Sequence, residues 1–377
     1  MKFLTKWYLN ELVPRIVFIP FWVSWFILSV VQAGRLIFKK SKNNQEHSKL
    51  CIEAGIKGWE SIEFKELYTS ACEYLTIEQV HKIEVTPDKD YLVQIKEALD
   101  STQPTHYLYD PRTGSQNWMK GLWQSFNIAI LLCWRKITPI VLLTDLAFRT
   151  WRTQSAVVTA KTGVVVIFMS PRKIYPIFPH RKLVGPSLMP LSKATLNFLD
   201  SLPEHSDHSS SHAIFTGSLY EPRTSILEKI RYGLEKRGQV LEIKGRELGS
   251  PRISDIEYWG RLKNADLVLT TANQMEQAGA DWMWIPNLVY RYLEVIACGT
   301  LLVAPNVPGV CRFFQDGEHF VSFSSPEEAV EVIEYYLINK EEQQKIAQQG
   351  KNRAKALVEG RSFWLSIDVA LGKNALT

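Results

Sequence analysis

Short apolar runs alternate with amphipathic stretches of helical length along most of this chain, and this alternation constrains the fold more than any other feature. Such apolar runs are typical of strands that are buried on both faces of a sheet, and helices usually connect strands of this kind when they run parallel. The sequence therefore predicts an α/β protein built from doubly wound, Rossmann-like parallel sheets.

The alternation occurs in two series along the chain. In the first series we expect strands at Leu50–Ala54, Lys82–Val85, His106–Tyr109, Ile140–Thr144 and Val164–Met169, and helices at Glu60–Tyr74, Tyr91–Leu99, Trp118–Trp134, Phe148–Lys161 and Ser192–Leu202. In the second we expect strands at Ala213–Thr216, Val240–Ile243, Asp266–Thr271 and Leu301–Ala304, and helices at Arg223–Arg237, Ser254–Lys263, Leu288–Cys298 and Pro326–Ile338. Ser325 has the residue type and position of a cap for the last of these helices.

A polar, serine-rich segment, Glu204–His212 (EHSDHSSSH), separates the two series. Its composition favours a tether, although its three histidines also allow metal binding. We therefore expect an N-terminal domain over residues 43–203, a linker over 204–212, a second domain over 213–360 and a tail over 361–377. In two doubly wound domains the carboxyl ends of the strands face a common cleft, which is where such sheets bind ligands.

The first 42 residues differ from the rest in charge and hydropathy. They carry seven basic side chains and one acidic side chain around an apolar run, Ile16–Val31. The basic cluster beyond this run argues against export by a signal peptide, whereas a single span and an in-plane anchor both remain open. Either arrangement predicts a protein attached to the membrane, with its two domains on the cytoplasmic face.

Composition excludes several other classes of protein. Because the net charge of the whole chain is +5, the residues after the basic N-terminal stretch are close to neutral, and a nucleic-acid partner is not expected. The five cysteines are scattered and show no metal-ligand spacing, which indicates reduced thiols. The nucleophile-elbow, P-loop, zinc-protease and dinucleotide-binding motifs do not occur in the sequence.

One carboxylate lies where a buried helix is expected. Glu294 is flanked by Leu293 and Val295, and Arg291 precedes it by three residues. An ion pair between Arg291 and Glu294 on a solvent-facing surface is one interpretation. A half-buried carboxylate also matches the two hydroxyls of a ribose, with the arginine pairing with it or reaching a phosphate. Both interpretations remain open on the residues alone.

The surrounding segment, YRYLEVIACGTLLVAPNVPGVCRFFQDGEHF, resembles the donor domain of GT-B glycosyltransferases. It is most similar to the CgeB-like branch of the group-one enzymes, and the segment FTGSLYEPR is similar to the start of that domain. The resemblance covers residues 213–360 and rests on a set of spaced positions: Arg291, Glu294, Ala297, Cys298, Gly299, Pro308, Gly309, Asp316 and Gly317. It implies a GT-B fold in which the first domain takes the acceptor and the second takes the donor.

The resemblance also implies site residues for a nucleotide-sugar substrate. Glu294 would contact the ribose together with Arg291, and the turn Gly217-Ser218 would approach the phosphates through its backbone N–H groups. Further cations would neutralise the leaving diphosphate: Arg223, Lys244 and Arg246. Neither a cofactor nor a metal is expected. Many group-one enzymes carry a second glutamate where this chain has Pro286, so the stereochemical outcome of transfer stays open and loss of activity is an alternative.

The acceptor side offers weaker candidates. Asp110 and Asp145 each follow a predicted strand and are expected to face the cleft, and His180 lies in the segment IFPHRKL. All three are candidates for the base that deprotonates an acceptor hydroxyl. Each also suits a cap, a turn or an ordinary loop residue. Asp88 and Asp90 spell the Asp-Lys-Asp metal motif of GT-A transferases, but their place before a predicted helix favours capping residues.

The combined prediction is a metal-independent glycosyltransferase at the cytoplasmic face of a membrane. Its acceptor would be a membrane lipid or a lipid-linked glycan, and its partners would be the nucleotide sugar and the lipid surface. A sugar-nucleotide epimerase and a non-catalytic scaffold with the same fold are the alternatives.

Overall fold

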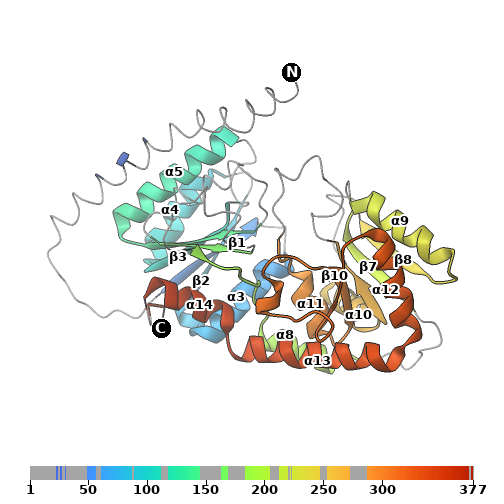
Figure 1. Ribbon diagram of the computed structural model, residues 1–377. Helices are drawn as coiled ribbons and strands as arrows, with labels where there is room; N and C mark the ends of the chain where they lie inside the picture. The colour runs from blue at the N-terminus through green and yellow to red at the C-terminus, as the bar shows by residue number, and fades with distance from the viewer. Residues whose placement is uncertain are drawn as a thin grey trace, which may run out of the picture.

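The computed structural model describes twelve segments of the chain and four separate positions. The segments are residues 49–56, 61–86, 89–111, 118–144, 163–168, 183–203, 212–219, 221, 223–246, 253–271, 287–372 and 375–376, and the separate positions are Val23, Phe26, Ile27 and Val30. These residues form two parallel sheets with helices on both faces of each (Figure 1). The predicted α/β architecture with two Rossmann-like domains is confirmed.

The N-terminal sheet has the strand order β2-β1-β3-β4-β5-β6, with every pair parallel. Its strands are β1 (Leu50–Ile56), β2 (Val80–Val85), β3 (His106–Tyr109), β4 (Thr138–Leu143), β5 (Val164–Ile167) and β6 (Leu183–Val184). Its helices are α3 (Ile62–Tyr74), α4 (Tyr91–Thr102), α5 (Trp118–Arg135) and α8 (Lys193–Ser201), with a short 3-10 helix at Ile77–Gln79. Buried side chains of α4 and α5 pack on one face of the sheet, and those of α3 and α8 pack on the other.

The C-terminal sheet has the order β11-β10-β9-β7-β8 and is also parallel. Its strands are β7 (Ala213–Ser218), β8 (Leu241–Arg246), β9 (Leu267–Leu269), β10 (Leu301–Pro305) and β11 (Val321–Phe323). Its helices are α9 (Arg223–Glu235), α10 (Asp255–Lys263), α11 (Arg291–Ala297), α12 (Pro326–Ile338) and α13 (Lys340–Glu359), with a 3-10 helix at Val310–Arg312. The Ser325 hydroxyl caps α12 by accepting the Glu328 N–H at 3.1 Å.

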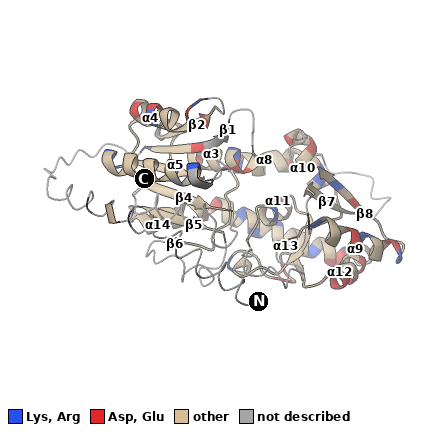
Figure 2. Cartoon of the chain, turned by 90° about the horizontal axis from the view of Figure 1, so that it is seen from above, with Lys and Arg blue, Asp and Glu red and all other residues tan. Residues whose placement is uncertain are grey.

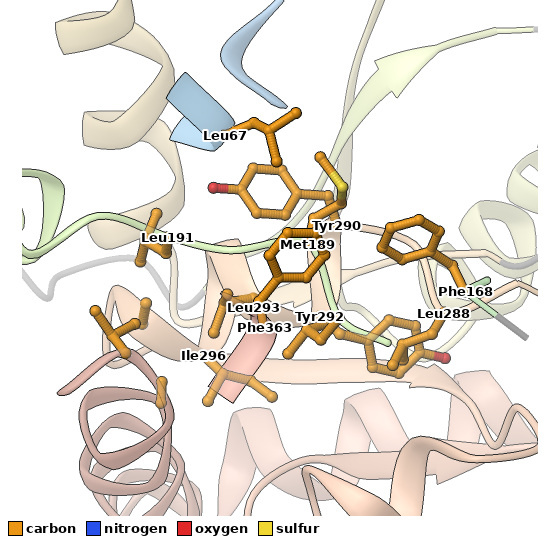
Figure 3. Packing of buried hydrophobic residues seen from close by; sticks show 14 of the residues in the cluster. Leu67, Phe168, Met189, Leu191, Leu288, Tyr290, Tyr292, Leu293, Ile296 and Phe363 are labelled. Atoms are coloured by element: carbon orange, nitrogen blue, oxygen red, sulfur yellow. The ribbon is translucent and has the colours of Figure 1, made fainter. Parts of the chain in front are cut away.

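An apolar cluster joins the two domains. Figure 3 shows Leu67 of α3 and Leu191, which precedes α8, near Tyr290 and Leu293 from the start of α11. The cluster continues without interruption from the N-terminal sheet to the C-terminal one. Burial of this shared apolar surface is expected to hold the domains in a defined relation, which in turn fixes the geometry of any site between them.

The chain returns to the N-terminal domain at its end. Residues after Gly360, which the sequence suggested as a tail, form helix α14 (Ser362–Leu371) beside β5 and β6 (Figure 2). The indole N–H of Trp364 donates to the Ser70 hydroxyl at 3.0 Å, and the Tyr74 hydroxyl donates to Asp368 at 3.1 Å. These hydrogen bonds connect α14, near the C-terminus, to α3 in the N-terminal domain.

Some sequence-based expectations lie outside the described residues. These are the membrane anchor over residues 1–42, the linker residues 204–211, the helix Phe148–Lys161 and Asp88. Within the anchor, the structure describes only Val23, Phe26, Ile27 and Val30, which are helical and exposed. Within the described ranges, no helix combines the length and the apolar character that crossing a bilayer requires. Asp90 caps α4 by accepting the Val93 N–H at 3.0 Å, as the capping interpretation predicted.

Candidate functional site

A cavity of about 950 Å³ lies between the two domains. Helix α3 supplies one wall, and the opposite wall comes from the carboxyl ends of β7 and β8 together with the first turns of α10 and α11. Figure 1 shows α10 and α11 on the side of the C-terminal domain that faces α3. This is the place that the topology of doubly wound sheets favours for a ligand, because the loops at the strand ends converge there.

Six of the seven residues that the sequence suggested for the donor line this cavity: Gly217, Ser218, Arg223, Lys244, Arg291 and Glu294. The seventh, Arg246, ends β8 directly beside Ser218 of β7, and its side chain lies outside what the structure describes. The parallel register of β7 and β8 brings these strand ends together, since Thr216 pairs with Lys244 and Gly217 pairs with Gly245.

Glu294 lies in the first turn of α11. The expected helix start at Leu288 was wrong, because the Leu288 N–H is bound to the Phe168 carbonyl of the other domain at 2.7 Å and residues 287–289 are not helical. The Glu294 side chain is buried, with 4% of the residue exposed. Its Oε1 accepts the Tyr258 hydroxyl at 2.7 Å, and its Oε2 lies 3.6 Å from Nε of Arg291.

Burial governs the charges at this wall. It raises the pKa of Glu294 above the ordinary value, and the nearby Arg291 guanidinium and the Tyr258 hydroxyl only partly oppose this effect. Burial also raises the pKa of Tyr258 well above 10, so that its hydroxyl remains a hydrogen-bond donor near neutral pH. The carboxylate consequently depends on these two neighbours to stay ionised.

Arg291 has an unfilled hydrogen-bonding position. Its guanidinium lies 5.2 Å from the centre of the Tyr258 ring, and its Nε faces Glu294. In the part of the chain that the structure describes, Nη1 of Arg291 is buried and has no hydrogen-bond partner. A buried cationic donor without a partner is unfavourable, and an anionic ligand in the cavity would satisfy it.

Other groups at the ends of β7 and β8 are held in place. Arg223 donates from Nε to the Thr271 hydroxyl and from Nη1 to the Ser218 carbonyl, each at 3.0 Å. Nζ of Lys244 lies 3.0 Å from Glu242. Gly217 adopts φ of 154°, and a Cβ atom at this position would lie 3.2 Å from the Phe215 ring. The backbone therefore approaches the cavity closely where a side chain would crowd it.

The N-terminal domain contributes residues that the sequence analysis did not single out. Ser61, Ile62, Glu63 and Lys65 line the cavity from the start of α3, and Lys65 forms an ion pair with Asp255 of α10 across the two domains. The sequence could have indicated these residues, because the helix predicted at Glu60–Tyr74 follows the first strand. In a doubly wound sheet the start of such a helix lies at the carboxyl ends of the strands, where ligands bind. No such pattern indicated Tyr258, since its partner lies 36 positions later in the chain.

Of the three candidates for an acceptor base, Asp110 is the one that lies among the described residues. Asp110 follows β3, is fully buried and does not line the cavity, although we expected it to face the cleft. Asp145 and His180 lie outside the described residues. Glu63 is the carboxylate that the N-terminal domain supplies to the described wall of the cavity.

The sequence matches a family model over residues 219–359, and the description of that family is "Glycosyl transferase-like". The match covers most of the C-terminal domain, including Arg223, Lys244, Arg291 and Glu294. No curated protein matches the sequence.

Solved structures resemble the chain over both domains. HepE from Anabaena, in complex with UDP-glucose, superposes with a TM-score of 0.55 at 10% identity, covering 85% of this chain and all of that one. A glycosyltransferase from Rickettsia africae gives 0.54 at 11% identity, covering 88% of this chain and all of that one. A sucrose-phosphate synthase from Thermosynechococcus elongatus gives 0.54 at 10% identity, covering 85% and 97%. At these identities the likeness establishes the fold.

The solved structures confirm the predicted two-domain GT-B architecture. The family match over residues 219–359 agrees with the predicted donor domain of a glycosyltransferase. Membership of the CgeB-like branch stays a prediction.

Proposed function

We propose that this protein binds a nucleotide sugar in the cavity between its domains and transfers the sugar to an acceptor hydroxyl. The observation that supports this most directly is the pairing of buried Glu294 with Arg291, whose Nη1 has no partner among the described residues. The pair offers carboxylate oxygens for ribose hydroxyls and a guanidinium for phosphate, side by side in one cavity wall. Because HepE was solved with UDP-glucose, a UDP-sugar is the first donor to test.

In this proposal the donor lies across the carboxyl ends of β7 and β8. The diphosphate would face the backbone of Gly217 and Ser218, with Arg223 and Arg291 as counter-charges. Fixed cations aimed at the leaving diphosphate stabilise the negative charge that develops there as the glycosidic bond breaks. The acceptor would enter from the N-terminal domain, where Asp145, His180 and Glu63 are the candidates for its base.

Thermal unfolding of the full chain with UDP-, GDP-, CMP- and dTDP-sugars tests the donor site. A ligand at a hundredfold excess over its dissociation constant is expected to add about 2.7 kcal/mol of stability, and one nucleotide class should raise the unfolding midpoint more than the others. Transfer is then measured as release of free nucleotide that depends on added acceptor. If no nucleotide sugar shifts the midpoint, the donor-site proposal is wrong and a scaffold becomes the better description.

We also propose that the acceptor is presented at a membrane surface, and the outer face of α5 supports this. Trp123 and Trp134 are 63% and 68% exposed, and the half-buried Phe126 and Ile130 lie between them at helical spacing on the same side. No acidic residue occurs from Trp118 to Arg135, and Figure 2 shows α5 almost wholly in the colour of uncharged residues. Exposed tryptophans on such a face suit the interfacial region of a bilayer.

Replacing Trp123 with serine in the full chain is expected to lower binding to vesicles that contain anionic lipid. Loss of one interfacial tryptophan should weaken binding to the vesicles roughly threefold or more. The reason is that up to about 150–250 Å² of aromatic surface is no longer transferred from water into the bilayer interface. Co-sedimentation with vesicles measures this, and Tyr232→Ser on α9 is the matched control, since Tyr232 is also exposed. Equal binding of all three proteins would show that α5 does not contact lipid, and no binding by the wild type would refute membrane attachment.

A further inference from the structure

We propose that Tyr258 is a positioning residue that holds Glu294 for a ribose and thereby makes the cavity select ribonucleotide over deoxyribonucleotide donors. The inference rests on the proposed function and adds a specificity to it. No motif in the sequence marked this tyrosine.

Tyr258 touches both members of the pair at the cavity wall. Its hydroxyl donates to Oε1 of Glu294 at 2.7 Å, and its ring lies 5.2 Å from the Arg291 guanidinium carbon. Glu294 and Arg291 both belong to α11, whereas Tyr258 belongs to α10. A contact between two helices therefore sets the orientation of the carboxylate, which a helix surface alone would leave free to rotate.

The hydrogen-bond count at Glu294 leaves room for two hydroxyls. Among the described residues, Tyr258 donates the only side-chain hydrogen bond that Glu294 accepts, because Nε of Arg291 lies beyond hydrogen-bond distance at 3.6 Å. Each carboxylate oxygen can accept two hydrogen bonds, so Oε1 retains one position and Oε2 retains both. A cis-diol carries two O–H donors at a fixed spacing and would fill a position on each oxygen, whereas a 2′-deoxyribose would leave one of these buried acceptor positions unfilled.

Tyr258 is itself firmly held. The neighbouring Trp259 is buried and packs edge-on to the Tyr258 ring at 5.4 Å. The first turn of α10 is capped by Ser254, whose hydroxyl accepts the Glu257 N–H at 3.2 Å. A rigid hydroxyl that fixes one carboxylate oxygen gives the other oxygen a defined place in the cavity, which is the kind of support that a selective site needs.

The test is Tyr258→Phe in the full chain, which removes the hydroxyl and keeps the ring beside Arg291. Dissociation constants for UDP, 2′-deoxy-UDP, GDP and 2′-deoxy-GDP are measured by calorimetry for the wild type and the variant. The wild type should prefer the ribonucleotide by roughly tenfold or more, since a buried acceptor left unpaired opposes the deoxy form. In the variant, ribonucleotide affinity should fall roughly tenfold while deoxyribonucleotide affinity changes little, so that the preference nearly disappears.

Tyr335→Phe is the matched control, because the Tyr335 hydroxyl donates to Glu342 at 2.7 Å on the surface of the other end of the domain. It should behave as the wild type. An unchanged preference in Tyr258→Phe, or an equal loss for both sugars, would assign the tyrosine to packing and overturn the inference. If the wild type binds none of the four nucleotides, the proposed function itself fails, which is a different result from either of these.

Discussion

Replacing Glu294 with glutamine is expected to weaken binding of the donor nucleotide by roughly 10- to 100-fold, because hydrogen bonds to a charged acceptor contribute about 1.5–3 kcal/mol. Glutamine has nearly the same shape, and its carbonyl can still accept the Tyr258 hydroxyl. What it removes is the negative charge that faces the ribose hydroxyls and Arg291. Calorimetric titration with the nucleotide that the thermal screen selects measures the change.

The matched control for this variant is Glu342→Gln. Glu342 also accepts a tyrosine hydroxyl, from Tyr335, but it lies on an exposed surface and does not line the cavity. Its replacement should leave nucleotide affinity unchanged. If Glu294→Gln is folded, as its unfolding transition would show, and still binds nucleotide as the wild type does, then the carboxylate has no part in the site.

The pH dependence of binding gives a second readout for Glu294. Burial raises its pKa above the ordinary value, so that protonation begins at a higher pH than for an exposed glutamate. Binding of a diol favours the carboxylate form, and affinity in the wild type should therefore fall as the pH is lowered from 7 toward 5. In Glu294→Gln this contribution disappears, while any titration of the ligand phosphate stays the same in both proteins.

The parts of the fold that the sequence predicted correctly are those decided by local chemistry. The runs around Val164–Ile167 and Leu301–Pro305 are apolar throughout, and both are central strands buried on each face. Ser192, Ser254 and Ser325 cap their helices with side-chain hydrogen bonds within three residues of sequence. Six donor residues share one cavity because parallel topology carries the ends of neighbouring strands to the same edge.

The features that the sequence missed depend on contacts between distant segments. The start of α11 is delayed because the Leu288 N–H binds a carbonyl of the other domain. Glu294 accepts a hydrogen bond from Tyr258 of α10, and the apolar pattern of α10 does not indicate that contact. Helix α14 docks through Trp364 on Ser70, which lies 294 residues earlier. Periodicity describes which face of a helix is apolar, and it carries no information on which surface will cover that face.

The burial of His106, the first residue of β3, has a measurable consequence for stability. This histidine is 8% exposed, and its Nδ1 lies 2.9 Å from the Thr105 hydroxyl. Burial lowers its pKa to about 4, although the carboxylate of Asp368 on α14 opposes that shift. In the folded protein the imidazole is thus neutral at pH values where an unfolded histidine already carries a proton.

The sign of the effect on stability follows from proton binding. Between the ordinary histidine pKa of 6.5 and the folded value of about 4, the unfolded state binds more protons, so stability falls as the pH falls. Each unit of pKa difference corresponds to 1.36 kcal/mol, which makes the full contribution of His106 about 3 kcal/mol once the pH is below 4.

Urea unfolding measured at several pH values between 7 and 4 should therefore show a steeper loss of stability in the wild type than in His106→Gln. Glutamine cannot gain a proton in this range, so the variant should lack about 3 kcal/mol of the acid-induced loss, whatever its stability at pH 7. His212→Gln is the matched control because His212 lies directly before β7, away from the N-terminal sheet, and this variant should keep the steep loss. Parallel pH profiles for the wild type and His106→Gln would mean that protonation of other groups, and not of His106, causes the acid-induced loss of stability.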